Sequence, residues 1–302
     1  MKEIKELIRR AIDLHVHIGP EPIPRKYTAD TLVKEEKGKI KAICVKSHFF
    51  PTAPLISDRI FLIGSVTLNN YVGGLNPDIV LANAVFGKQI VWFPTINAKN
   101  FMKRREYEIP AEWVSDSKYL RKTSDIKGIS VLKNKKLTKD ALRVIDAIEK
   151  TNSVLATGHV SWKEAEMLAK EGLRRNIKVI LTHPLYGPIS MPLSVQRSLA
   201  KKGAFIEVTY ASFTIDKIPV KRLAEQIRLV GPKNCIISSD VGQTFSKSPS
   251  KSLFEFANLL IAEGITKKEL ELMLVKSPTK IINYINKHRR GIYYETYDCK
   301  RS

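Results

Sequence analysis

The sequence predicts an α/β protein whose core is a parallel, TIM-like (β/α)8 barrel. Short apolar runs typical of buried strands alternate with amphipathic helical segments along nearly all of the 302 residues. This βα alternation favours a parallel sheet. A doubly wound open sheet is the alternative, but no Gly-x-Gly-x-x-Gly sequence follows the first strand. The barrel is therefore the better fit.

The first strand candidate, residues 12–18, shows the period of a β-strand. Its apolar residues Ile12, Leu14, Val16 and Ile18 alternate with polar ones, so we expect the apolar side chains on one face. In all there are nine strand candidates: 12–18, 41–48, 61–68, 89–95, 128–132, 153–159, 178–184, 204–210 and 235–240. A (β/α)8 barrel has only eight strands. We assign 128–132 to a hairpin or flap in the fourth βα loop, because the helix before residue 153 then follows the fourth strand.

Helices are expected between these strands, and some carry recognisable start and stop signals. Thr28 is a candidate N-cap and Gly38 a candidate stop for the helix after the first strand. Ser161 and Glu164 have the spacing of a capping box at the start of another helix. The expected helices are 1–12, 28–38, 76–87, 137–150, 162–175, 194–202 and 219–230.

The domain organisation follows from this order of elements. A chain of this length can form one large α/β domain or two small ones. Because the βα alternation continues from end to end, we expect a single barrel domain over residues 1–302. The polar segment 97–132 is expected to be an insertion or lid, and residues 287–302 a C-terminal tail.

The net charge of +21, from 51 basic and 30 acidic residues, favours anionic partners. The basic residues are dispersed, and no recognisable nucleic-acid-binding module is present, so a small anionic molecule is favoured over nucleic acid. No apolar run is long enough to predict a membrane span. The three cysteines lack a metal-binding or disulfide spacing, and a reducing cytoplasm is the expected location. A homo-oligomer is possible.

Five of the six histidines stand where predicted strands end. His15 and His17 share one face of the first strand, and His48, His159 and His183 follow the second, fifth and sixth barrel strands. Asp240 ends the eighth. In a barrel, the C-terminal strand ends converge on one mouth, where active sites are built. Because neutral imidazole is a common ligand of divalent metals, this set predicts a metal site.

This ordered pattern resembles the amidohydrolase superfamily of metal-dependent hydrolases, here an uncharacterised branch of it. The resemblance runs from the sequence DLHVH at residues 13–17 to the stretch from Ser277, which is similar to the final helix of many members. It implies that His15, His17 and His159 are metal ligands and that His183 matches the strand-six position, which is a second-metal ligand or a substrate-polarising group.

Asp240 matches the strand-eight carboxylate, which in the superfamily touches the metal and takes the proton of the attacking water. Two-metal members place a carboxylated Lys or a Glu at the end of strand four. Here residues 92–97 read WFPTIN, with neither. The resemblance therefore implies one divalent metal per chain, zinc by preference, with Asp240 and His183 as the catalytic residues.

Other residues near the expected mouth are candidates for substrate binding. Lys46 and His48 could bind an anionic group, and Lys46 could also be carboxylated. Glu207 points either into the mouth or toward a neighbouring helix, and Tyr186 could shape the pocket. Asp13 could orient a ligand histidine.

The expected function is hydrolysis of a C–N or C–O bond, as in an amide, cyclic amide, lactone or amine, in a small and anionic molecule. Metal-dependent decarboxylation without hydrolysis is an alternative within the same site. A basic barrel protein associated with nucleic acid is an alternative of another class, but it leaves the histidines and Asp240 unexplained.

Overall fold

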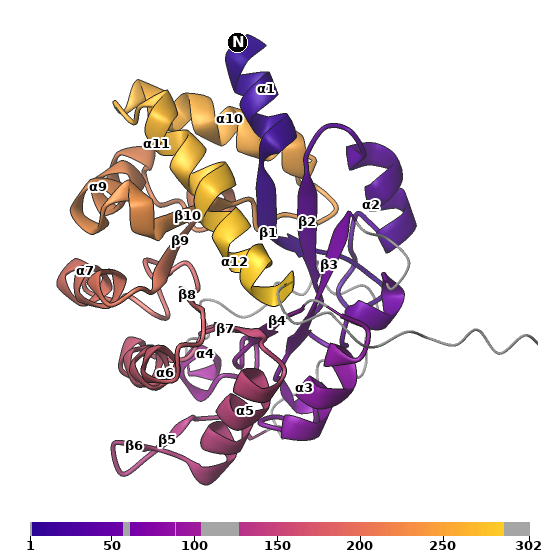
Figure 1. The fold of residues 1–302 in the computed structure, drawn as a ribbon, viewed down its shortest axis with the longest axis vertical. Coiled ribbons are helices and arrows are strands. Elements are labelled where there is room, and N and C mark those ends of the chain that lie inside the picture. The colour runs from indigo at the N-terminus through magenta and orange to yellow at the C-terminus, as the bar shows by residue number, and fades with distance from the viewer. Residues whose placement is uncertain (1, 57–60, 88, 104–126, 287–302) are drawn as a thin grey trace, which may run out of the picture.

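The structure is a computed structural model that describes residues 2–56, 61–87, 89–103 and 127–286. Its centre is an eight-stranded parallel sheet in the order β1-β2-β3-β4-β7-β8-β9-β10 (Figure 1). The strands are β1 Ile12–His17, β2 Ala42–Lys46, β3 Leu62–Thr67, β4 Gln89–Trp92, β7 Val154–Ala156, β8 Val179–Leu181, β9 Phe205–Thr209 and β10 Cys235–Ser238. The predicted (β/α)8 fold is confirmed.

Backbone hydrogen bonds between β1 and the segment after β10 close the sheet into a barrel. The His17 N–H donates to the Val241 carbonyl (2.7 Å), and the Asp240 N–H donates to the His15 carbonyl (2.8 Å). Val16 and Val241 form a parallel bridge at the same place. Closure therefore brings the two histidines of β1 beside Asp240, more than 200 residues away in the sequence.

Helices surround the barrel, and most of the expected ones are present within one or two residues of their predicted bounds. The N-cap role of Thr28 and the capping box of Ser161 with Glu164 are both formed. The helices are α1 Lys2–Arg10, α2 Ala29–Glu36, α3 Pro77–Ala84, α4 Lys99–Met102, α5 Lys139–Lys150, α6 Trp162–Arg174, α7 Leu193–Lys201, α8 Tyr210–Thr214, α9 Val220–Val230, α10 Pro249–Ala262, α11 Lys267–Glu271 and α12 Ser277–Asn286.

Several short helical turns are also present among the described residues. A π-helical turn spans Leu272–Lys276, and 3-10 turns span Ala53–Leu55, Asn70–Val72 and Pro232–Asn234. Helix α10 was not among the expected elements, although Pro249 at its first position is a common helix start. Among the described residues, no helix combines the length and the apolar character needed to cross a membrane.

The hairpin expected in the fourth βα loop exists, but it lies a few residues further along the chain. Strands β5 Leu132–Lys133 and β6 Lys136–Leu137 pair antiparallel, and the expected strand 128–132 contributes only an isolated bridge from Ile129 to Ala98. Asn134 and Lys135 both have positive φ, the conformation that a tight two-residue hairpin turn needs. Residues 104–126 of the expected lid and the expected tail 287–302 lie outside the described residues.

The core has two layers. One fills the barrel with side chains from alternate strand positions, including Ile12, Leu14 and Trp92, and Ile281 and Ile282 of α12 pack against it. Figure 1 shows α12 lying across this end of the barrel. Because Ile12 is the first residue of its strand, α12 covers the N-terminal end, and the opposite end remains for a site. The other layer packs the outside of the sheet against the helices.

The expectation that Ile12, Leu14, Val16 and Ile18 share one face is wrong. The pairing of β1 with β2 shifts register between Asp13 and Val16. Ile12 and Leu14 belong to the barrel interior, whereas Val16 and Ile18 pack in the outer layer. A bulge inserts one unpaired residue and so reverses the alternation.

Candidate metal centre at the barrel mouth

The mouth, as used here, is the end of the barrel formed by the C-terminal ends of its strands. His15 and His17 come from the second half of β1, and Asp240 lies two residues beyond β10. Most of the remaining predicted site residues also lie at or beyond strand ends, namely Lys46, His48, His159, His183 and Tyr186, whereas Glu207 lies within β9. The fold thus gathers on one side of the molecule residues that are dispersed in the sequence.

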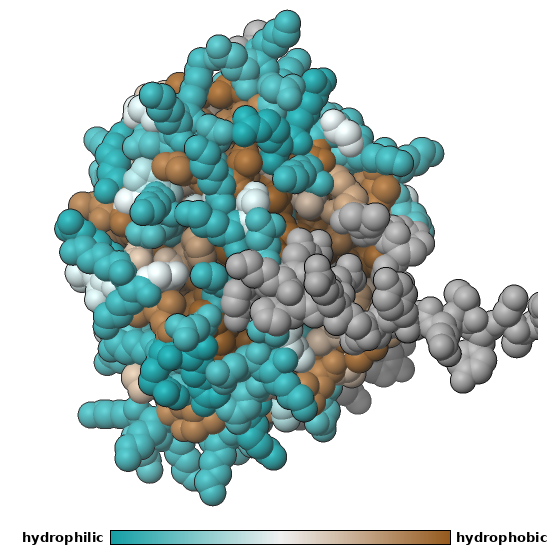
Figure 2. Space-filling model, viewed as in Figure 1, coloured by the Kyte–Doolittle hydropathy of each residue, from teal (hydrophilic) through white to brown (hydrophobic). Residues whose placement is uncertain are grey.

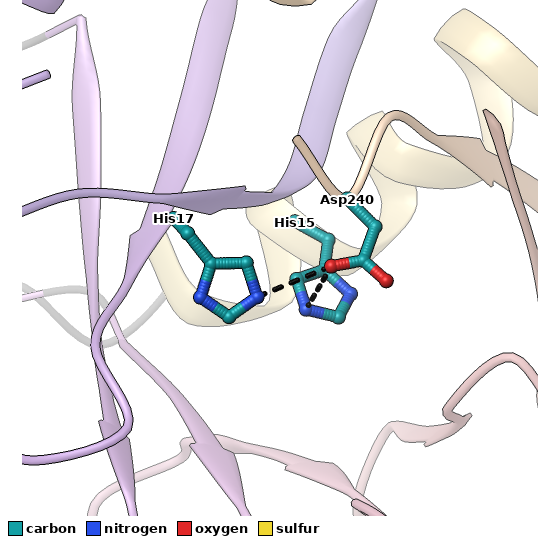
Figure 3. Close-up of side chains that lie close together, drawn as sticks. All are labelled: His15, His17 and Asp240. Atoms are coloured by element: carbon teal, nitrogen blue, oxygen red, sulfur yellow. Dashed lines mark hydrogen bonds and ion pairs between the residues drawn. The ribbon is translucent and has the colours of Figure 1, made fainter. Parts of the chain in front are cut away.

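Three of these side chains converge most closely. His15 Nε2 lies 3.2 Å and His17 Nε2 3.1 Å from the same oxygen, Asp240 Oδ1. Figure 3 shows both rings directed at that carboxylate from neighbouring positions on β1. Both histidines are buried, and the Asp240 side chain is 15% exposed. Two nitrogens and a carboxylate oxygen aimed at one place form a donor set typical of zinc and similar ions.

Glu207 of β9 lies behind His15 and fixes its orientation. His15 Nδ1 is 3.2 Å from Glu207 Oε1, and the backbone N–H of His183 donates to Glu207 Oε2 (3.2 Å). A carboxylate facing Nδ1 holds the proton of the neutral ring there and leaves the lone pair on Nε2. Glu207 is itself almost fully buried. Glu207 therefore supports the ring of His15, and its side chain is not accessible to solvent.

This tautomer provides the test of whether a metal fits the site. With its proton on Nδ1, His15 presents a lone pair on Nε2 to Asp240 Oδ1 at 3.2 Å, and both atoms are then acceptors. A cation between them would convert this repulsion into two favourable contacts. The ammonium of Lys46, 3.0 Å from His15 Nε2, is placed to donate to the same lone pair and would have to yield it to an ion. The donor set of two imidazole nitrogens and a carboxylate oxygen fits a divalent ion.

Burial sets the charge state of the site. It lowers the pKa of His183 to about 4 and those of His15 and His17 well below their ordinary value. The imidazoles are thus neutral, as metal ligands must be. Burial also raises the pKa of the Asp240 carboxyl, an effect that the nearby His15 and Lys46 oppose.

His159 and His48 lie at the mouth but outside the closest group. The His159 ring is 5.0 Å from that of His183 and 5.2 Å from Tyr186, measured between centroids. His48 packs against His17 at 4.7 Å, and its Nδ1 is 2.9 Å from Thr95 Oγ1. These rings line the mouth beside the His15–His17–Asp240 group.

Some buried ring nitrogens at the mouth have no hydrogen-bond partner among the described residues. They include His159 Nδ1 and His183 Nδ1. A buried polar atom without a partner is costly in free energy, and such atoms cluster at sites that bind water, ions or ligands. The ligand role expected for His159 is neither formed nor excluded by the distances, and it stays a prediction.

Glycines permit the close approach of the segments that carry these residues. A Cβ on Gly242 would lie 2.1 Å from the His17 carbonyl oxygen, and one on Gly158 would lie 2.1 Å from the Phe93 carbonyl oxygen. Each glycine has positive φ and stands one or two residues from a site residue, His159 or Asp240. Asp240 itself has φ of 54°, an uncommon value for a residue other than glycine.

Two features of the mouth were not predicted from the sequence. Glu21 and Arg25, in the Pro-rich loop after β1, form a buried ion pair, and Glu21 Oε2 also accepts from Ser47 Oγ (2.6 Å) and the His48 N–H (2.9 Å). This pair anchors the loop to the end of β2. The ammonium of Lys46 lies 4.3 Å from the centroid of the Trp92 ring. The sequence did offer one signal for the ion pair: Glu21 and Arg25 carry opposite charges four residues apart in a loop that follows β1.

Comparison with known structures identifies the class of fold. An amidohydrolase from Pseudomonas aeruginosa aligns with a TM-score of 0.63 at 12% identity, covering 93% of this chain and 98% of that one. The probable dipeptidase PvdM from the same organism aligns with a TM-score of 0.57 at 11% identity, covering 95% of this chain and 98% of that one. A probable 2-pyrone-4,6-dicarboxylic acid hydrolase from Acinetobacter baumannii, with citric acid bound, aligns with a TM-score of 0.55 at 15% identity. This alignment covers 91% of this chain and 99% of that one.

At these identities the comparisons establish the fold, and the predicted resemblance to the amidohydrolase superfamily is confirmed at that level. By sequence, the chain belongs to a family of unknown function (DUF6282), which matches residues 10–207. No curated protein sequence matches the chain significantly. The matched range contains the DLHVH sequence, His159, His183 and Glu207, but ends before Asp240.

Proposed function

We propose that this protein is a metal-dependent hydrolase that cleaves a C–N or C–O bond in a small anionic molecule at the barrel mouth. The observation that carries the proposal is the convergence of His15 Nε2 and His17 Nε2 on Asp240 Oδ1 at 3.1–3.2 Å. Two of the similar structures are called a probable dipeptidase and a probable 2-pyrone-4,6-dicarboxylic acid hydrolase, and both names describe hydrolases.

The proposed cofactor is one divalent ion, zinc by preference, held by His15, His17 and Asp240 with His159 as the predicted fourth ligand. Imidazole nitrogens and a carboxylate oxygen are donors that suit zinc, which would take water as a further ligand. A second group, His15, His183 and Glu207, is also close together. Glu207, however, already faces His15 Nδ1 and the His183 N–H. This engagement favours one ion over two.

The bound ion would act as a Lewis acid that makes water acidic enough to attack near neutral pH. Asp240 is placed to accept the proton of that water, because its Oδ2 points away from the two β1 histidines toward His183 Nε2, 3.8 Å away. Neutral His183 is placed to hold a proton toward the substrate oxygen on which negative charge develops. Asp240 and His183 are therefore the proposed catalytic residues.

An anionic substrate is supported by the positive charge beneath the mouth. Lys46 is fully buried, so its charge is only weakly screened by water, and it lies at the centre of the site. It would attract and stabilise a carboxylate or phosphate in the mouth through its field. The side chains of His48 and Tyr186, whose rings line the mouth, are the proposed contacts for the rest of the substrate.

Elemental analysis of the purified protein, followed by an activity screen, tests this function. The screen should contain amides, cyclic amides, lactones and amines, each with an anionic group, and β-keto and aromatic carboxylic acids as decarboxylation substrates. We expect metal-dependent hydrolysis of at least one anionic compound. Release of CO2 without hydrolysis, or a protein that binds no divalent ion, would overturn the proposal.

A further inference from the structure

A second concave feature lies at the opposite end of the barrel from the mouth. It is a pocket of about 540 Å³ between α1, the π-helical turn, α12 and the loops before β2 and β10. Five basic residues line it, together with Leu272, Val275 and Thr279; they are Arg10, Lys41, Lys233, Lys276 and Lys280. No acidic residue lines it. Its chemistry is therefore unlike that of the histidine-rich mouth.

The positive charge of this pocket is only partly balanced. Glu271 lies 2.7 Å from Arg10 and 3.9 Å from Lys276, so it offsets part of the charge of those two residues. The ammonium groups of Lys41, Lys233 and Lys280 form no ion pair with a carboxylate in the described part of the chain. These three lysines are exposed to solvent. Three uncompensated cations around one hollow favour an anion with several charges.

The backbone beneath these residues is tied together and well suited to hold them in place. The Lys41 N–H donates to the Ala11 carbonyl (2.9 Å), and Ser277 Oγ donates to the Lys233 carbonyl (3.1 Å). Arg10, Lys41 and Lys233 stand one or two residues before β1, β2 and β10. The barrel thus fixes the backbone at these three positions.

The apolar lining restricts the class of ligand. Leu272 and Val275 belong to the π-helical turn and line the pocket together with the basic residues. Figure 2, which shows the face with α1 and α12, has hydrophilic side chains interspersed with apolar surface there. The volume suits a molecule of nucleotide size. An extended nucleic acid would need a longer basic track along the surface.

We propose that this pocket binds a small molecule that carries two or three phosphate groups next to an uncharged ring. The phosphates would contact Lys41, Lys233 and Lys280, and the ring would lie on Leu272 and Val275. The site is separate from the proposed catalytic centre and does not depend on it. Nothing in the hydrolase proposal requires a polyphosphate at this end of the barrel.

Calorimetric titration of the full chain tests this proposal, in buffer without added divalent cations. The probes are ATP, inorganic tripolyphosphate, adenosine and a 20-base-pair DNA duplex. We expect ATP to bind with about one site per chain, more tightly than tripolyphosphate, and adenosine to bind weakly. The triple variant Lys41→Gln, Lys233→Gln, Lys280→Gln should raise the Kd for ATP roughly tenfold or more.

The matched control is Lys139→Gln, Lys201→Gln, Lys221→Gln, which removes the same charge from exposed positions away from the pocket. It should bind ATP as the unmodified chain does, and circular dichroism should show both variants folded. Equal loss of binding in the two variants, unchanged binding in the pocket variant, or no saturable binding would overturn the proposal. Tripolyphosphate binding as tightly as ATP would refute the role of the apolar lining. A duplex that binds the pocket lysines more tightly than ATP would assign the site to nucleic acid.

Discussion

Lys46 Nζ lies 3.0 Å from His15 Nε2, the same nitrogen that faces the Asp240 carboxylate at 3.2 Å. A fully buried ammonium thus shares the centre of the mouth with the proposed metal ligands. Its positive charge and that of a divalent ion would repel each other at this distance. The charge state of Lys46 is therefore coupled to whatever binds between His15 and Asp240.

The ligand set predicts the metal content of variants. The unmodified protein should contain about one divalent ion per chain. His17→Asn should lose most of it, because it removes a nitrogen from the group around Asp240 Oδ1. His48→Asn is the matched control, since His48 is a buried mouth histidine outside that group. Mass spectrometry of dialysed proteins measures this. Two ions per chain, with Lys46 or His48 required for one of them, would contradict the one-metal form.

Replacement of Asp240 should separate catalysis from folding. Asp240→Asn should reduce kcat on the order of 10²-fold or more, because the amide cannot accept the proton of the attacking water. The fold and the KM should change little, since Asn keeps the shape of the side chain. Steady-state kinetics and circular dichroism check this outcome. Near-normal turnover in the variant would remove Asp240 from the mechanism.

The buried charge of Lys46 should matter more for activity than the dispersed charge of the surface. Lys46→Met should lower kcat/KM for an anionic substrate and affect an uncharged analogue less. The control replaces several exposed lysines remote from the mouth, such as Lys139 and Lys201, by Glu. If Lys46→Met leaves activity unchanged while the surface variant loses tight duplex binding at physiological salt, the charge serves nucleic acid.

Lys46 also predicts a pH-dependent stability. Burial lowers its pKa to about 8 from an ordinary value of 10.5, so folding disfavours the protonated side chain. This cost is fully present below pH 8 and is lost as the pH rises toward 10.5. In metal-free protein, Lys46→Met should therefore raise the free energy of unfolding at pH 7, by at most about 3 kcal/mol, and the gain should fade by pH 10.5.

Urea denaturation at pH 7 and pH 10 measures this difference, with the exposed Lys139→Met as control. The control should stay within about 0.5 kcal/mol of the unmodified protein at both values. A lower stability of Lys46→Met at pH 7 would show that the contacts of Lys46 with His15 and Trp92 outweigh the cost of its burial.

Gly242 should be required for the closure of the barrel at the site. Gly242→Ala would place a Cβ 2.1 Å from the His17 carbonyl oxygen at a φ of 132°. Gly231→Ala is the matched control, because Gly231 also has positive φ, 99°, but has no atom within 4 Å of the added Cβ. The control should cost about 1–3 kcal/mol from backbone strain.

Gly242→Ala should cost about 1–3 kcal/mol more than that control, because its Cβ also overlaps backbone. It should lose bound metal as well, since Asp240 and His17 flank the clash. Chemical denaturation and metal analysis of the two variants decide between these expectations. Equal stability and equal metal content would show that the segment after β10 can shift without cost.

Much of the fold was predictable because its signals are local. Thr28 and Ser161 mark helix starts through bonds to residues three positions away. The hairpin was predicted at 128–132 but lies at 132–137. Its turn depends on the positive φ of Asn134 and Lys135, which an apolar strand pattern does not reveal. The bulge in β1 was equally invisible, because it arises from pairing with β2.

The order of the eight barrel strands was determined by the sequence alone, and so were the positions of His15, His17, His183 and Asp240 at strand ends. Hydrophobic period and helix caps act over a few residues, so they can be read along the chain. Tertiary structure alone decided that Glu207 lies behind His15 and that Lys46 contacts both His15 and Trp92. It also gathered Lys41, Lys233 and Lys280 around one pocket, from α12 and the segments before β2 and β10. These neighbours are far apart in the sequence, and their contacts depend on strand register and barrel closure, which no local pattern specifies.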